Sequence, residues 1–176
     1  QFSVNIDNKD IQFETMSDYH KIISQCSFNR IPNVTSTATM DLENAKIDLA
    51  MNMLNKICML LSFSNGNWIT PLYTDYFKEG ILLRTVFHKN KTYRFNKSRH
   101  LIESRNSPFV PLIDFLTRSY IKYDSLVKEF SIHKVIEYYI SAHVNNIEQE
   151  KFAVGYIALE VICNAVPPYA TKKGEV

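Results

Sequence analysis

The residues best able to do chemistry in this chain are an arginine and a histidine of one basic segment. Arg94 and His100 are separated by five residues in the sequence RFNKSRH. An arginine can hold a scissile phosphate while a histidine moves a proton, which is the chemistry of metal-independent RNA cleavage. Six arginines and five histidines also produce this spacing by chance. We expect Arg94 at a strand end and His100 in a loop, so the two are candidate catalytic residues only.

A second arginine and histidine lie close together, on one face of a predicted strand. Arg84 and His88 are four residues apart, and side chains at even spacing share one side of a strand. We interpret this pair as a solvated edge. The candidate binding residues are instead two aromatic side chains around a predicted hairpin and two basic side chains of the polar segment 96–106: Trp68, Tyr73, Arg99 and Arg105.

Other kinds of site do not fit the residue patterns. The four glycines do not cluster, so the chain has no glycine-rich phosphate loop. There is no HExxH motif, and the three cysteines form no CxxC pair. His133 and His143 are ten residues apart, too far to share a metal ion on one helix. We therefore expect no metal and no cofactor.

The amino-acid composition is that of an ordinary folded protein. The chain has 176 residues, 45% hydrophobic residues and a formal net charge of +2. This charge gives no global argument for nucleic-acid binding, although a local basic patch would be compatible with it. No apolar run reaches the ~18 residues of a membrane span, so we expect no membrane segment. Cysteines without a disulfide pattern favour a reducing, cytoplasmic location.

The sequence predicts strands first and helices later. Phe2–Ile6, 11–14 and 32–39 alternate as strands do. A helix is expected from about Thr39 to Phe63, followed by a turn at Asn65-Gly66 and a hairpin whose best strand is Ile81–Phe87. From Ser107 onward, apolar residues at helical spacing predict several helices with short connections.

The expected fold class is α+β, with a small antiparallel β part and a hairpin packed on a mainly helical bundle. We expect Leu61 and Leu83 in its core, and Glu160 partly buried among the apolar residues of GYIALEVICNAV, where it would need a partner. We expect the chain to be a fragment of a larger protein. Its predicted parts are a partial β-rich region at 1–40, a long helix and hairpin at 41–95, a polar linker at 96–107, a helical bundle at 108–166 and a tail at 167–176.

Two stretches resemble a known family. The sequence LLSFSNGNWITPLYTDYF and the later GYIALEVIC are similar to prokaryotic ApeA-like proteins, which have a C-terminal HEPN-type helical bundle. The similarity covers roughly residues 35–166. It implies an RNA-targeting protein of phage defence or toxin systems, and a homodimer formed through the helices. The family's Arg-x4–6-His motif lies late in the bundle, and none follows Glu160 here, so the resemblance does not assign that role to Arg94 and His100.

Two classes of function remain open. The first is RNA cleavage or binding of HEPN type, by a fragment that lacks the catalytic motif. The alternative is a non-enzymatic sensing or protein-interaction module that recognises a partner through its aromatic hairpin, including Tyr76 and Phe77. Exposed aromatic residues on the hairpin would favour the second class. An Arg-x4–6-His motif on a helix just beyond Val176 would favour the first.

Overall fold

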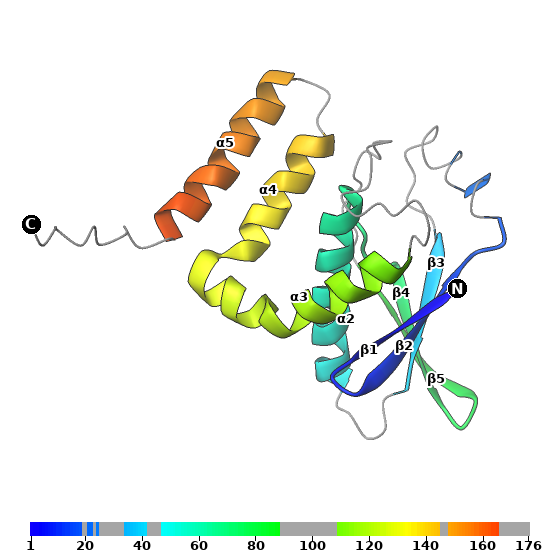
Figure 1. Cartoon of the computed structure of the whole chain (residues 1–176). Coiled ribbons are helices and arrows are strands. Elements are labelled where there is room, and N and C mark those ends of the chain that lie inside the picture. Colours follow the sequence, from blue (N-terminus) through cyan, green and yellow to red (C-terminus); the bar gives the residue numbers. More distant parts are fainter. Residues whose placement is uncertain are drawn as a thin grey trace, which may run out of the picture.

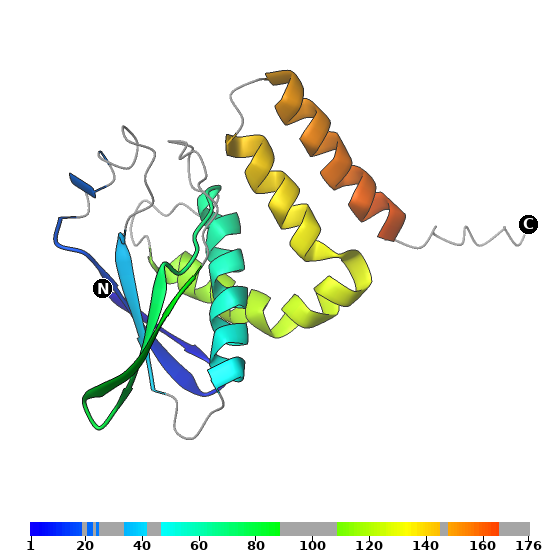
Figure 2. The same cartoon turned by 180° about the vertical axis from the view of Figure 1, so that it is seen from behind.

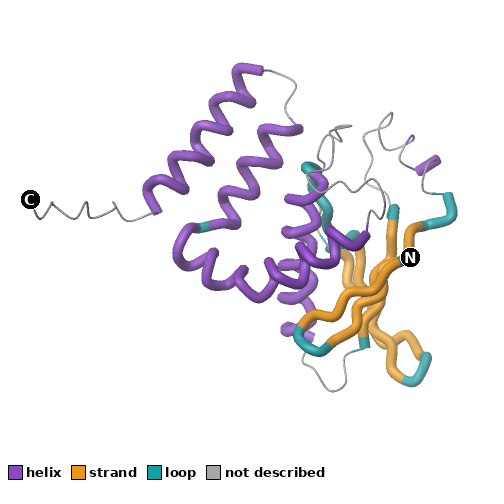
Figure 3. Tube along the Cα trace, viewed as in Figure 1, coloured by secondary structure: helices purple, strands orange, loops and turns teal. Residues whose placement is uncertain are grey.

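The computed structural model describes residues 1–18, 21–22, 24, 34–41, 47–88, 109–144 and 148–165. Within these ranges the chain forms two antiparallel sheets and four α-helices, which confirms the predicted α+β class (Figure 1, Figure 3). The predicted linker and tail lie outside the described residues. None of the helices within the described ranges is long and apolar enough to cross a bilayer.

The first sheet contains three strands in the order β1-β2-β3. These are β1 (Phe2–Ile6), β2 (Lys9–Thr15) and β3 (Ser36–Met40). Asp7 and Asn8 connect β1 to β2 with φ angles of 50° and 60°. Such left-handed conformations match the twist of a two-residue hairpin turn, and aspartate and asparagine adopt them at little cost.

One face of β1 and β2 is apolar and covered, as the alternation in the sequence predicts. Val4 lies opposite Ile11, and both are buried. Phe2 and Phe13 stack with ring centroids 4.8 Å apart. The intervening residues of β1 and β2 are mostly polar and exposed. These two strands therefore have one face in the core and one in solvent, whereas β3 is exposed on both sides except at the half-buried Met40.

Three helices complete the core. α2 (Ile47–Asn65) lies beside the sheet, and α3 (Phe109–Phe130) contacts both β1 and α2 (Figure 1, Figure 2). Ser131, with a φ of 47°, separates α3 from α4 (Ile132–Val144). One cluster of buried side chains joins β1, β2, α2, α3 and α4. Its members are Val4, Ile6, Ile11, Phe13, Met53, Ile57, Leu60, Leu116, Tyr120, Tyr123, Ile136 and Ile140.

The hairpin and the last described helix lie outside that cluster, and β3 reaches it only through the partly buried Met40. The hairpin of β4 (Tyr73–Lys78) and β5 (Ile81–Phe87) forms a two-stranded sheet of its own. α5 (Glu148–Ala165) packs mainly on α4 as its antiparallel neighbour (Figure 1). In both views the turn of the hairpin points away from α5 (Figure 2). Neither element contributes a residue to the core cluster.

Two predictions about burial were wrong. Leu83 is 63% exposed, because no layer formed by the described residues packs over much of β5, whereas Leu61 does pack against the core. Glu160 is exposed, because α5 turns only one side towards α4 and the charge lies on another. In both cases strand or helix periodicity is present, but no element in the described part of the chain covers the face that it defines.

Candidate functional site

The residues predicted for catalysis and binding divide into two groups. Arg94, Arg99, His100 and Arg105 lie outside the described residues. Their role in RNA chemistry therefore stays a prediction from the sequence. Trp68 and Tyr73 are described, and they lie in different environments on either side of Pro71.

Trp68 belongs to the structure that ends α2. Gly66 has a φ of 65°, the left-handed conformation common just after a helix. The Ser62 hydroxyl donates to the carbonyl of Cys58 at 2.6 Å and accepts from the backbone N–H of Ile69 at 2.8 Å. Trp68 is half-buried and packs against the core. The SNGNW sequence thus fixes how the chain leaves the helix, a structural role that needs no ligand.

Tyr73 begins an apolar surface on the hairpin. Residues directly opposite in an antiparallel pair share a face, and the strand register pairs Tyr73 with Phe87, Asp75 with Thr85, and Phe77 with Leu82. We call this set the outer face of the hairpin. Its four large side chains are well exposed: Tyr73 44%, Phe77 63%, Leu82 51% and Phe87 81%. Asp75 accepts a 2.6 Å hydrogen bond from the Thr85 hydroxyl between them.

The opposite face of the hairpin is more buried. Tyr76 is 9% exposed, and its hydroxyl has no hydrogen-bond partner among the described residues. His88 Nε2 lies 2.8 Å from Thr74 Oγ1, so this histidine joins the two strands. Arg84 lies opposite Tyr76 and is exposed. Arg84 and His88 therefore do not form a shared phosphate site in this arrangement; His88 has a structural partner and Arg84 faces solvent.

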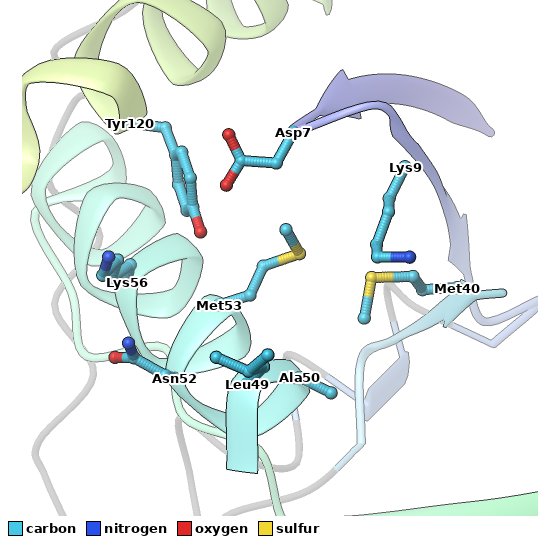
Figure 4. A pocket seen from close by; sticks show the side chains of 9 residues that line it. All are labelled: Asp7, Lys9, Met40, Leu49, Ala50, Asn52, Met53, Lys56 and Tyr120. Carbon is cyan, nitrogen blue, oxygen red and sulfur yellow. The ribbon is translucent and has the colours of Figure 1, made fainter. Parts of the chain in front are cut away.

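A cavity of about 280 Å³ lies between the β1–β2 turn, the end of β3 and α2 (Figure 4). Its lining combines apolar side chains with the charged side chains of Asp7, Lys9 and Lys56. Nine residues line it: Asp7, Lys9, Met40, Leu49, Ala50, Asn52, Met53, Lys56 and Tyr120.

Three polar side chains of this cavity, those of Asp7, Tyr120 and Lys56, have partners within the structure. The carboxylate of Asp7 points towards the Tyr120 hydroxyl (Figure 4), and burial followed by the charge and hydrogen bond of Asp7 raises the pKa of that tyrosine to about 12. Lys56 Nζ lies 2.7 Å from a carboxylate oxygen of Asp124 and 5.3 Å from the centre of the Tyr120 ring. This network ties the first sheet, α2 and α3 together, and a protonated Tyr120 is no base at neutral pH.

Cys58 is not activated as a nucleophile, and no metal-binding cluster is found among the described residues. Burial raises the pKa of the Cys58 thiol to about 12, and the thiolate is the reactive form of cysteine. Among the described residues, no group of three or more His, Cys, Asp or Glu side chains is placed to hold a metal ion.

Helix α5 carries a second exposed apolar surface. Phe152, Tyr156 and Leu159 follow one another at helical spacing and are 79%, 62% and 62% exposed. Ala158 on the covered side of the helix is buried. We call the three exposed residues the α5 stripe. The stripe was not among the predicted site residues, although its spacing is visible in the sequence.

Comparison with known proteins identifies no relative of this chain. No protein-family model matches the chain, and neither a curated protein nor a solved structure matches it significantly. The similarity to HEPN-type proteins therefore stays a prediction from the sequence, and the geometry of the hairpin and of α5 carries the functional argument.

Proposed function

We propose that this chain is a non-enzymatic protein-interaction module that recognises a partner through the outer face of the hairpin. The observation that carries the proposal is the exposure of Tyr73, Phe77, Leu82 and Phe87 on one surface. With ~200 Å² for each large apolar side chain, these fractions correspond to roughly 500 Å² of accessible surface. Exposed apolar patches of this size on soluble proteins are often functional.

The composition of the outer face also fits a recognition surface. Interfaces are enriched in aromatic residues and poor in charges at their centre. Here three aromatic rings and a leucine surround a single carboxylate, that of Asp75, which is already hydrogen-bonded to Thr85. A partner can therefore cover the face without leaving that carboxylate unsatisfied.

The proposal includes a homodimer and a cytoplasmic location. The α5 stripe supplies a separate apolar surface, at a distance from the hairpin turn (Figure 1). A helix with one face on α4 and an apolar stripe on another suits pairing with the same helix of a second chain. The free thiol of the half-buried Cys58 suits a reducing compartment.

Co-purification from the native host cells tests the proposed function. The tagged chain is compared with the double variant Phe77→Ser and Phe87→Ser, and with Phe152→Ser and Leu159→Ser as a matched control on α5. We expect one protein that the wild type and the control recover equally, and that the hairpin variant loses at least about tenfold. Equal recovery by all three chains would contradict the proposal.

RNA targeting of HEPN type is the second candidate function. Its support is the sequence resemblance, together with the antiparallel helices α4 and α5 in the part of the chain where the resemblance places a bundle. The resemblance assigns no catalytic residues within the chain, so Arg94 and His100 are candidates from their residue types and spacing alone. Cleavage of a labelled single-stranded RNA in the presence of a chelator, by the wild type and by Arg94→Ala and His100→Ala variants, tests it directly.

A further inference from the structure

The free edge of β5 offers a more specific mode of partner recognition than the outer face alone. β4 and β5 pair with each other, and no third strand joins them in the described part of the chain. A two-stranded ribbon is marginally stable by itself, whereas a third strand that shares its apolar face adds stability. The edge of such a ribbon presents unpaired N–H and C=O groups to any extended segment.

The hydrogen-bond pattern shows which groups point outward. The backbone N–H of His88 donates to the carbonyl of Leu72 at 3.0 Å, so residue 88 belongs to a hydrogen-bonded pair. Hydrogen-bonded and non-hydrogen-bonded pairs alternate along an antiparallel ladder. The N–H and C=O groups of Phe87 and Thr85 therefore point away from β4, and their side chains belong to the outer face.

The sequence of β5 does little to protect this edge. Natural edge strands are usually guarded by lysine, proline or a short length. β5 runs for seven residues, ILLRTVF, with neither lysine nor proline. Ile81, Leu82, Leu83 and Phe87 are all more than half exposed. The irregularity in the pairing lies between Tyr76 and Phe77, which leaves the half of β5 from Arg84 to Phe87 in regular register.

The charge of Arg84 determines which kind of partner strand fits beside β5. Arg84 is the only charged residue of β5; it is exposed, and the ion pairs found among the described residues do not include it. Opposite charges across neighbouring strands stabilise a sheet, and like charges destabilise it. A second copy of β5, antiparallel and fully overlapping, would bring two Arg84 side chains directly or diagonally opposite. An acidic residue of a different protein removes that conflict.

We propose that β5 accepts an extended segment of a partner protein as a third strand, with alternate apolar side chains on the outer face and an acidic residue opposite Arg84. This inference rests on the proposed function and names the class of partner. The backbone groups of Thr85 and Phe87 supply the main-chain hydrogen bonds, and the outer face and Arg84 supply selectivity.

The first test uses two capped nine-residue peptides that alternate threonine and valine and carry either glutamate or lysine at the centre. Binding to the full 176-residue chain is followed by NMR titration. We expect the glutamate peptide to bind at least about fivefold more tightly than the lysine peptide. The variant Arg84→Glu should reverse this preference. An unchanged preference in that variant would overturn the charge assignment.

The second test concerns the main-chain bonds. Thr85→Pro removes an outward-pointing backbone N–H. Thr85→Val keeps this N–H and loses only the hydroxyl that donates a hydrogen bond to Asp75. We expect Thr85→Pro to abolish binding of the glutamate peptide and Thr85→Val to retain it. In the wild type, the amides of Thr85 and Phe87 should exchange rapidly alone and slowly with peptide. Slow exchange in the free chain would mean that the edge is already occupied, which overturns the inference whatever the proline variant does.

These outcomes separate the inference from the proposed function. If the cellular partner depends on Phe77 and Phe87 but the peptides do not bind, the outer face docks on a folded surface and strand addition is wrong. If partner recovery is also independent of those two residues, the proposed function fails as well. Peptide binding that needs the Thr85 N–H, together with a partner lost in the hairpin variant, supports both.

Discussion

The ring of Tyr73 on β4 lies across from the ring of Phe87 on β5, with centroids 6.4 Å apart and planes inclined by 52°. This cross-strand aromatic pair stabilises the hairpin at the end nearest the rest of the molecule. Both rings are nevertheless exposed, Phe87 to 81%. The contact between the two rings holds them in place while most of their surface stays in solvent. The proposed recognition depends on this combination.

The first prediction separates stability from binding at Phe87. Phe87→Ser should lower the free energy of unfolding by no more than about 1 kcal/mol, because a side chain this exposed loses mainly its pair with Tyr73. Thermal unfolding followed by circular dichroism measures this. A loss of several kcal/mol would show that the ring is buried in solution and would contradict a free outer face.

A second prediction compares two leucines. Leu116 is fully buried in the core cluster, whereas Leu83 is 63% exposed. Leu116→Ala should cost about 2–5 kcal/mol, and Leu83→Ala less than about 0.5 kcal/mol. Chemical denaturation of both variants tests the assignment. Similar losses of unfolding free energy in the two variants would mean that Leu83 is buried in solution and that another part of the chain covers the hairpin.

Part of this fold follows from local pattern. Val4 and Ile11 alternate with polar residues, and Met53, Ile57 and Leu60 recur at helical spacing, so strands, helices and their inner faces could be predicted. The same alternation placed Leu83 in the core wrongly. Local pattern defines the faces of a strand but does not say whether another element covers both of them.

The candidate site was only partly predictable for the same reason. Tyr73 and Phe77 were recognised as hairpin aromatics, but Phe87 joins them through strand register, and Leu82 through the irregularity after Tyr76. The contact of Asp7 with Tyr120 joins a turn and a helix far apart in the sequence. No local pattern encodes such a contact, since it depends on how α3 crosses the sheet.

A third prediction concerns alkaline pH. Burial, followed by the effect of Asp7, raises the pKa of Tyr120 from 10.0 to about 12. The unfolded chain ionises this hydroxyl near pH 10, before the folded chain does, so its contribution to stability is complete below pH 10 and is lost as pH rises towards 12. The difference in phenolate absorbance between the wild type and Tyr120→Phe should give a midpoint well above 10. A midpoint near 10 would contradict the buried contact with Asp7.

A fourth prediction concerns the thiol of Cys58. Because burial raises its pKa to about 12, the thiolate is scarce in the folded chain at pH 8. Alkylation followed by peptide mass spectrometry should find Cys58 unmodified in the native chain and fully modified after unfolding. Rapid modification of the native chain would mean that the end of α2 opens, and would reinstate Cys58 as a candidate nucleophile.

A fifth prediction addresses the α5 stripe. If the homodimer forms through α5, Phe152→Asp should shift the chain from dimer to monomer in sedimentation velocity without changing its far-UV circular dichroism spectrum, because the ring is 79% exposed within one chain. Ile121→Asp is the matched control, since Ile121 is 75% exposed on α3. A wild-type monomer at high concentration would remove the dimer from the proposal.

The most direct measurement for the central claim is photo-crosslinking in the native host cells from position 87. A photoreactive phenylalanine analogue replaces Phe87 in one chain and Phe152 in another, and adducts are identified by mass spectrometry. We predict one discrete protein adduct at position 87 that is absent at position 152 and disappears with Phe77→Ser. No adduct at position 87, or the same adducts at both positions, would contradict recognition through the outer face of the hairpin.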